Sequence, residues 1–333
     1  MIKRTLSAAV LAALASAMLL TTPAAAASGH GDGHGHHQDN GRPATYQLTG
    51  DEGGSKFEGI GADTRRGTFY VSEVTGGEIH RGTVGSSRTT QWIAGDGTDG
   101  RYTARGITVD DQGRVYIAGG PNGIGTGRPD LWVYSPGGKL LAALRAPGDN
   151  VFLNDVWIGP DGAAYFTNSN SPQLFRVAQQ HGTWSAKLFA DATGTIDVTI
   201  APNVFNLGGI VLSADRSAFI VAQGNVGKLW RFPVRGGQVT EVRTGGADLT
   251  NADGLVRQGN KLTVVRNFSK MIATLKVSND GRSAWLISER ATDPDRVLTT
   301  AKELRGRILF VDSKFDETVA TPPYQVITNP YGK

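Results

Sequence analysis

The 333-residue sequence contains no cysteine. Disulfides are therefore excluded, and the fold must be held together by packing and by pairing between strands. The same absence excludes a lipoprotein anchor, because no cysteine follows the apolar N-terminal segment.

The sequence also lacks a large excess of positive or negative charge. Only 19% of the residues are charged. Without Lys3 and Arg4, which lie in the predicted leader, 32 of the 34 basic residues remain against 30 acidic ones, a formal charge of +2. This near balance gives no support to a nucleic-acid or membrane partner. We expect a monomer that binds a small-molecule substrate or ligand.

Glycine, by contrast, is abundant, with 45 residues, while the hydrophobic content of 39% is ordinary. This composition indicates a turn-rich globular β protein rather than a disordered chain.

The N-terminus has the features of an export signal. Lys3 and Arg4 precede an apolar run from Leu6 to Leu20, and small residues follow at 23–27. We interpret residues 1–27 as a signal peptide and the protein as secreted, since the run is short for an uncleaved membrane anchor. Residues 28–43 predict a disordered tail rich in Gly and His, whose four clustered imidazoles would chelate metal ions weakly.

Residues 44–331 contain a sixfold repeat. An apolar strand begins with a variable polar position followed by a small residue, and then a turn and further strands follow. The repeat starts are separated by about 45 to 54 residues, which is typical of propeller blades. The variable positions are Glu58, Arg105, Asn154, Gly208, Asp253 and either Thr299 or Thr300.

Each repeat contains four predicted strands, so the sequence predicts an all-β fold, a six-bladed β-propeller. The last repeat lacks one strand at its C-terminal end. Residues 44–49, upstream of the first repeat, can supply that strand and close the ring, which would remove the open sheet edges.

The first strand of each blade lines the channel of a propeller, so the variable positions should form one ring. Asn206 lies two residues before Gly208, on the same side of an extended strand, and could reach the same space. We predict Glu58, Asn154, Asn206 and Asp253 as ligands of a metal ion. Oxygen ligands without Cys or His suit a hard cation, Ca²⁺ or another divalent ion. Alternatively, Arg105 pairs with the carboxylates and no metal binds.

Several of the same residues form motifs that resemble those of a known family. Phe57-Glu58-Gly59-Ile60, Asn154-Asp155 and Asn251-Ala252-Asp253-Gly254-Leu255 resemble the regucalcin and gluconolactonase-like six-bladed propellers. The chain is also similar to secreted actinobacterial propellers sometimes labelled superoxide dismutases, but its ring lacks the histidines that redox metals need. The resemblance implies a divalent cation held by Glu58, Asn154 and Asp253, and hydrolysis of lactones or phosphotriesters. Gly208 departs from the family, which usually has Asn there.

These features predict a Ca²⁺-dependent hydrolase of lactones or related esters, with the metal polarising the carbonyl group. Asp253 is the candidate general base or metal ligand, and Arg105 the residue that orients an anionic substrate oxygen. Asp253 could instead only accept backbone hydrogen bonds at a turn. The alternative function is a non-catalytic propeller that binds a ligand or a protein at the channel mouth.

Two further groups receive structural interpretations. Trp132, Trp157, Trp230 and Trp285 are expected to pack between blades. Residues 302–307, which contain Lys302 and Arg307, are expected to form a solvated turn.

Overall fold

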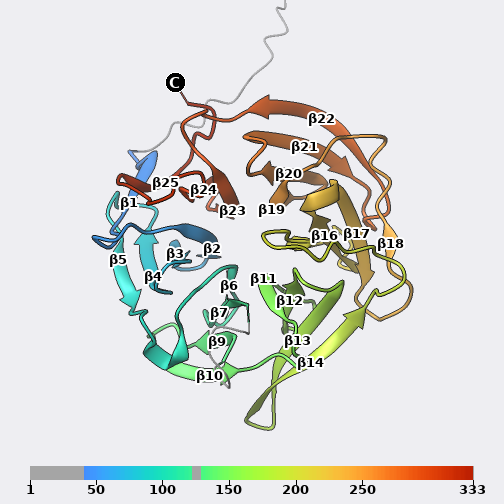
Figure 1. Ribbon diagram of the computed structural model, residues 1–333, viewed down its shortest axis with the longest axis horizontal. Helices are drawn as coiled ribbons and strands as arrows, with labels where there is room; N and C mark the ends of the chain where they lie inside the picture. The colour runs from blue at the N-terminus through green and yellow to red at the C-terminus, as the bar shows by residue number, and fades with distance from the viewer. Residues whose placement is uncertain (1–40, 122–128, 333) are drawn as a thin grey trace, which may run out of the picture. The chain divides into compact units, whose positions relative to one another are not determined.

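The computed structural model describes residues 41–121 and 129–332. The described residues form six antiparallel sheets arranged as blades around a central axis (Figure 1). Each blade begins with its innermost strand, and the six-bladed propeller predicted from the repeat is confirmed. The first three blades contain β2 (Phe57–Asp63), β3 (Thr68–Glu73), β4 (Ile79–Thr83) and β5 (Thr90–Ile93); β6 (Ile107–Val109), β7 (Val115–Ala118), β9 (Leu131–Tyr134) and β10 (Leu140–Leu144); and β11 (Phe152–Ile158), β12 (Ala164–Asn168), β13 (Gln173–Gln180) and β14 (Thr183–Asp191).

The other three blades repeat this order, and two short 3-10 helices, η1 (Thr98–Gly100) and η2 (Gly224–Val226), lie in connections. A short strand, β8 (Gly120–Pro121), pairs with β11 on the channel side of blade three. Blades four to six contain β15 (Leu207–Leu212), β16 (Ala218–Gln223), β17 (Lys228–Pro233) and β18 (Thr240–Glu241); β19 (Ala252–Gln258), β20 (Lys261–Arg266), β21 (Met271–Val277) and β22 (Ala284–Ala291); and β23 (Leu298–Leu304), β24 (Arg307–Asp312), β25 (Tyr324–Ile327) and β1 (Thr45–Leu48).

The ring is closed by β1, which forms the outer strand of blade six. It runs antiparallel to β25, with Thr45 opposite Ile327 and Leu48 opposite Tyr324. The predicted closure by the N-terminal strand is therefore confirmed. Closure joins both ends of the propeller chain in one sheet and supplies the fourth strand of blade six.

The hydrophobic core lies between the blades. Six buried clusters occur among the described residues, and each contains residues of two adjacent blades. In β16, for example, Phe219 and Val221 pack toward blade three, while Ile220 and Ala222 pack toward blade five. Because side chains alternate between the two faces of a strand, an apolar strand fills the core on both of its sides.

Two of the structural expectations are wrong. Trp285 lies on β22, the outermost strand of blade five, where 54% of its surface is exposed. Lys302 is buried on β23, the innermost strand of blade six, and its Nζ lies 4.3 Å from the ring centre of Trp157. The position of a strand within the blade decides its exposure, and residue type alone does not reveal that position.

The predicted signal peptide, residues 1–27, and residues 28–40 of the predicted tail lie outside the described residues. Among the described residues, no helix is both long and apolar enough to cross a membrane.

Candidate functional site at the channel mouth

An irregularity in the innermost strands aims the variable residues into the channel. The pairing of β2 with β3 shifts between Phe57 and Ile60, and that of β11 with β12 shifts between Leu153 and Val156. The innermost strands of blades four, five and six shift at the matching place. Such bulges bend a strand and redirect a side chain. The common register also identifies Thr299, rather than Thr300, as the ring position of blade six.

The small residue after each variable position is where neighbouring innermost strands touch. A Cβ atom on Gly59 would lie 2.9 Å from the backbone carbon of Arg105. A Cβ atom on Gly254 would lie 2.5 Å from Cα of Thr300. Glycine is thus required for close approach of the backbones at these positions. This packing brings the ring residues of adjacent blades together at one level.

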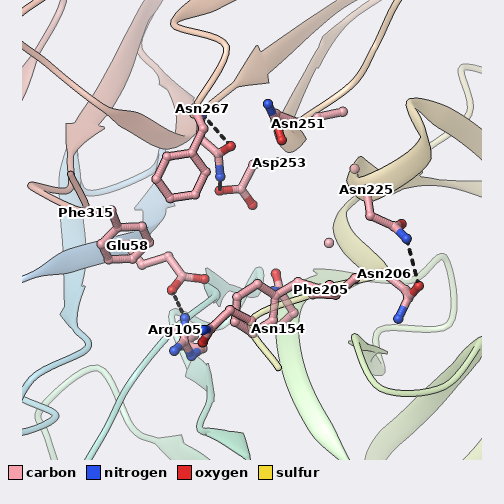
Figure 2. Close-up of a pocket in the computed structure, with 16 residues that line it drawn as sticks. Glu58, Arg105, Asn154, Phe205, Asn206, Asn225, Asn251, Asp253, Asn267 and Phe315 are labelled. Carbon is pink, nitrogen blue, oxygen red and sulfur yellow. Dashed lines mark hydrogen bonds and ion pairs between the residues drawn. The ribbon is translucent and has the colours of Figure 1, made fainter. Parts of the chain in front are cut away.

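The ring residues of blades one to five line a cavity of about 360 Å³ (Figure 2). Glu58 reaches it from β2 in blade one and Asp253 from β19 in blade five, and both carboxylates point toward the same space. Loops supply the remaining wall. Its lining residues are Glu58, Arg105, Asn154, Asn203, Val204, Phe205, Asn206, Gly208, Gly224, Asn225, Asn251, Ala252, Asp253, Asn267, Phe268 and Phe315.

An ion pair occupies one side of the cavity. Nη1 of Arg105 donates a hydrogen bond to Oε2 of the buried Glu58. The guanidinium lies over Phe152, with its central carbon 4.6 Å from the ring centre, and 5.9 Å from that of Phe205. Burial raises the pKa of Glu58, and the charge of Arg105 opposes that rise. The predicted pairing of Arg105 with a ring carboxylate therefore exists.

Asp253 faces a different environment. Its Oδ2 accepts a hydrogen bond of 3.0 Å from Nδ2 of Asn267. Burial and the charge of Glu58 raise the pKa of Asp253 well above its ordinary value, and the hydrogen bond from Asn267 counteracts them in part. The two carboxylates disfavour each other's ionisation, because Arg105 neutralises only one of them.

Asn154 and the empty position at Gly208 lie beside Asp253. A Cβ atom on Gly208 would be 3.7 Å from Oδ1 of Asp253 and 3.8 Å from Oδ1 of Asn154. Both oxygens thus face the point where a side chain at residue 208 would begin. Asn154 is buried, lines the cavity and directs its Oδ1 toward this point. Its carboxamide oxygen is available to a ligand.

Asn206 reaches the cavity wall, but its side chain is engaged in structural contacts. Its Oδ1 accepts hydrogen bonds from the backbone N–H of Thr199, at 2.8 Å, and from Nδ2 of Asn225, at 3.1 Å. Its Nδ2 donates to the carbonyl oxygen of Ser169 at 2.9 Å. Figure 2 shows Asn206 directed toward Asn225. The structure thus brings Glu58, Asn154 and Asp253 together, with Asn206 at the border of the group.

At the ring position of blade six, two threonine hydroxyl groups face the backbone of β2. Both Thr299 and Thr300 donate hydrogen bonds to the carbonyl oxygen of Glu58, at 3.0 and 2.5 Å. They fix the strand that carries Glu58 and leave its carboxylate free to face the channel.

Sequence reasoning missed the residues that loops contribute, above all Asn267 and the aromatic side chains Phe205, Phe268 and Phe315. Phe205 and Phe268 are 43% and 55% exposed, which makes an apolar rim around a polar floor. The available signal was an Asn and a Phe next to a strand end: Phe205-Asn206 directly precedes β15, and Asn267-Phe268 directly follows β20. Only the folded loops show which of these residues face the cavity.

The residues present suit a divalent cation. The available ligands are the second carboxylate oxygen of Glu58, Oδ1 of Asn154 and Oδ1 of Asp253, all of them oxygens. When both acids are ionised, the ring with Arg105 carries one net negative charge. A cation with oxygen preference and loose geometry, such as Ca²⁺, would relieve the repulsion that raises the pKa of Asp253.

Fold and site together define a six-bladed propeller with an acidic, oxygen-lined pocket at one end of its channel. The model of the SMP-30/Gluconolactonase/LRE-like region matches residues 57–263, more than half of the chain. The protein belongs to this family, as the sequence motifs predicted. The comparison with curated proteins gave no match.

Solved structures share the fold at low sequence identity. A gluconolactonase from Xanthomonas campestris is similar with a TM-score of 0.58 and 17% identity, covering 83% of this chain and 87% of that one. The calcium-binding protein regucalcin from Agrobacterium tumefaciens has a TM-score of 0.55 and 16% identity, covering 84% and 96%. A virginiamycin B lyase from Staphylococcus aureus has a TM-score of 0.55 and 14% identity, covering 80% of each chain.

Proposed function

We propose that the protein is a divalent-cation-dependent hydrolase of lactones or related esters, with Ca²⁺ as the cation. The observation that carries the proposal is the convergence of Glu58, Asn154 and Asp253 on one cavity, with a pKa for Asp253 raised by burial and by the nearby carboxylate. A perturbed carboxyl group in a pocket is typical of a functional site. The gluconolactonase-like family supports the same reaction class.

Glu58, Asn154 and Asp253 would hold the cation, which supplies Lewis-acid polarisation of the substrate carbonyl when bound. Arg105 keeps Glu58 in place, and its guanidinium lies over the ring of Phe152. Its guanidinium is the group that would orient an anionic oxygen of the substrate.

Asp253 is the residue that would move the proton. Its carboxylate accepts a proton from a water molecule as the water oxygen forms a bond to the carbonyl carbon. The acyl C–O bond then breaks, and the proton passes from Asp253 to the departing alkoxide. A lactone thus gives a hydroxy acid, and an open-chain ester gives an acid and an alcohol. Nδ2 of Asn267 donates a hydrogen bond of 3.0 Å to Oδ2 of Asp253, and Oδ1 faces the cavity beside Gly208.

The aromatic rim favours substrates with an apolar part. Phe205, Phe268 and Phe315 surround the polar floor and would cover an acyl chain or ring while they exclude water. The expected substrate therefore combines a lactone or ester carbonyl with an adjoining apolar group.

The test is turnover of a lactone panel by metal-stripped protein with and without added Ca²⁺. We expect saturable hydrolysis that requires Ca²⁺ and that disappears in Glu58→Gln. The control is Glu52→Gln, an exposed carboxylate outside the cavity. Unchanged turnover in Glu58→Gln protein of normal thermal stability would refute the mechanism.

A second candidate is a non-catalytic propeller that binds a ligand at the same mouth. The ion pair between Arg105 and Glu58 favours it, because the guanidinium occupies one of the carboxylate oxygens that a cation would use. Saturable, cation-dependent turnover of any lactone would exclude this candidate.

We also propose that the protein acts outside the cell, because residues 1–27 have the composition of an export signal. N-terminal sequencing of protein from the culture medium should begin near Ala27 or Ser28. Retention of Met1 in the mature protein would contradict export by cleavage.

A further inference from the structure

A second group of carboxylates lies on blade one, outside the channel cavity. Asp51 belongs to the loop between β1 and β2, Glu73 ends β3, and Glu78 directly precedes β4. One oxygen atom from each of these residues lies within 4.8 Å of the others. None of the three lines the cavity described above.

Glu78 is the central member of this acidic cluster. Its residue surface is only 6% exposed, and its Oε2 has no hydrogen-bond partner among the described residues. The backbone makes room for the carboxylate, since a Cβ atom on Gly76 or on Gly95 would lie 2.5 Å from one of its oxygens. A buried carboxylate oxygen without a partner is costly and calls for a ligand.

The surroundings offer little positive charge. Oε1 of Glu73 accepts a hydrogen bond of 2.8 Å from Oγ1 of Thr75, and its Oε2 lies 3.5 Å from Nε2 of the buried His80. Neither ring nitrogen of His80 has a hydrogen-bond partner among the described residues. Burial, together with the charges of Glu73, Asp96 and Asp51, raises the pKa of Glu78 to about 7. One imidazole therefore faces several carboxylates.

We propose that Asp51, Glu73 and Glu78 form a second divalent-cation site, separate from the channel. Three carboxylates suit Ca²⁺, whose ligands are oxygens in a flexible arrangement. The cation would join the loop that follows the closing strand β1 to blade one. It would thereby strengthen the ring closure and raise thermal stability without taking part in turnover.

The experiment uses the full-length, metal-stripped protein and Ca²⁺ alone, at about pH 8, where Glu78 is ionised. Ca²⁺ is chosen because the histidines at 30–37 are poor ligands for it. Calorimetry and thermal melts are compared for Glu58→Gln, Glu78→Gln and the double variant, with Glu52→Gln as the exposed control.

In the Glu58→Gln background we expect one equivalent of Ca²⁺ to bind and to raise Tm by several degrees. Addition of Glu78→Gln should weaken this binding at least tenfold and remove the shift, whereas Glu52→Gln should preserve both. Glu78→Gln should melt at or above the wild-type temperature without metal, since it removes buried charge, so loss of binding cannot be attributed to unfolding. Absence of Ca²⁺ binding in Glu58→Gln, or unchanged binding after Glu78→Gln, would overturn the proposal.

Discussion

Arg105, two residues before β6 of blade two, forms an ion pair with Glu58 on β2 of blade one, at the mouth of the channel. The ion pair has two opposing effects, one on the stability of Glu58 and one on cation binding. It stabilises a buried carboxylate in the metal-free protein, and it occupies one oxygen that a cation would use.

Replacement of Arg105 should separate these two roles. In Arg105→Met the apolar stem still covers Phe152, but Glu58 loses its partner. We expect the free energy of unfolding of the metal-free protein to fall by about 3 kcal/mol, the cost of an unpaired buried charge. Ca²⁺ affinity in the channel should rise about tenfold or more, as measured by calorimetry in a Glu78→Gln background. A lower affinity would show that Arg105 helps to form the cation site.

Gly208 offers a gain-of-function test. A Cβ atom there would meet its nearest neighbours at 3.7 to 3.9 Å, which is ordinary contact. Gly208→Asn should therefore fold normally and place a carboxamide oxygen beside Asn154 and Asp253, and Ca²⁺ affinity should increase. Gly208→Ala is the control and should leave affinity unchanged.

The neighbouring Gly209 should behave differently. A Cβ atom on Gly209 would lie 3.0 Å from the backbone nitrogen of Leu255 and still closer to the carbonyl oxygen of Asp253. Gly209→Ala should lower the free energy of unfolding by about 1 to 3 kcal/mol, because two blades would be forced apart. Chemical denaturation of both glycine variants would measure the contrast, and equal stabilities would contradict the packing argument.

Asp253→Asn should uncouple activity from stability. The substitution removes a buried carboxylate whose pKa is raised by burial and by Glu58. The metal-free protein should therefore melt at a higher temperature than wild type. Turnover should fall at least about 100-fold, the usual contribution of a general base. Activity close to that of the wild type would show that Asp253 is not the general base and has only a structural role at the turn.

The stability of blade three should depend on pH through Asp161. Burial raises the pKa of Asp161, but hydrogen bonds from Arg176, Ala163 and Tyr165 outweigh it and lower the pKa below 3.8. Because the folded-state pKa is the lower one, this stabilisation is complete above pH 3.8 and is lost as the pH falls through the folded-state value.

Asp161→Asn should thus lower the free energy of unfolding by about 0.5 to 1 kcal/mol at neutral pH, a value reduced for partial exposure. The difference from wild type should vanish under strongly acid conditions. Asp111→Asn is the control, since that carboxylate is 96% exposed and lies 3.8 Å from Arg65. A difference that persists at acid pH would contradict the assignment to charge.

The repeat revealed most of the architecture in advance. Small residues such as Gly59 and Gly254 recur where innermost strands touch, and this contact is needed in every blade. The missing strand of the last repeat also predicted the pairing of β1 with β25. These features can be predicted from the sequence, because every blade packs against its neighbours in the same way and therefore repeats the same local sequence pattern.

Other parts of the site were not readable in this way. Asn267 reaches Asp253 from the turn after β20, and Phe315 comes from the connection between β24 and β25. Loops carry no periodic pattern, so their side chains cannot be placed without the fold. For Asn206 the position was predicted but the contacts were not. Strand alternation placed it near the ring but did not reveal its hydrogen bonds with Thr199 and Asn225.

The sequence by itself determined the blades, their closure and the level of the channel at which Glu58, Asn154 and Asp253 lie, because repeat spacing and backbone contact are encoded locally. The tertiary structure alone decided the partners of these residues. Whether Arg105 faces Glu58 or Asp253, and whether Glu78 finds Asp51 and Glu73, depends on how separate segments approach in space. Charge pairing falls off over a few ångströms, and the sequence does not contain those distances.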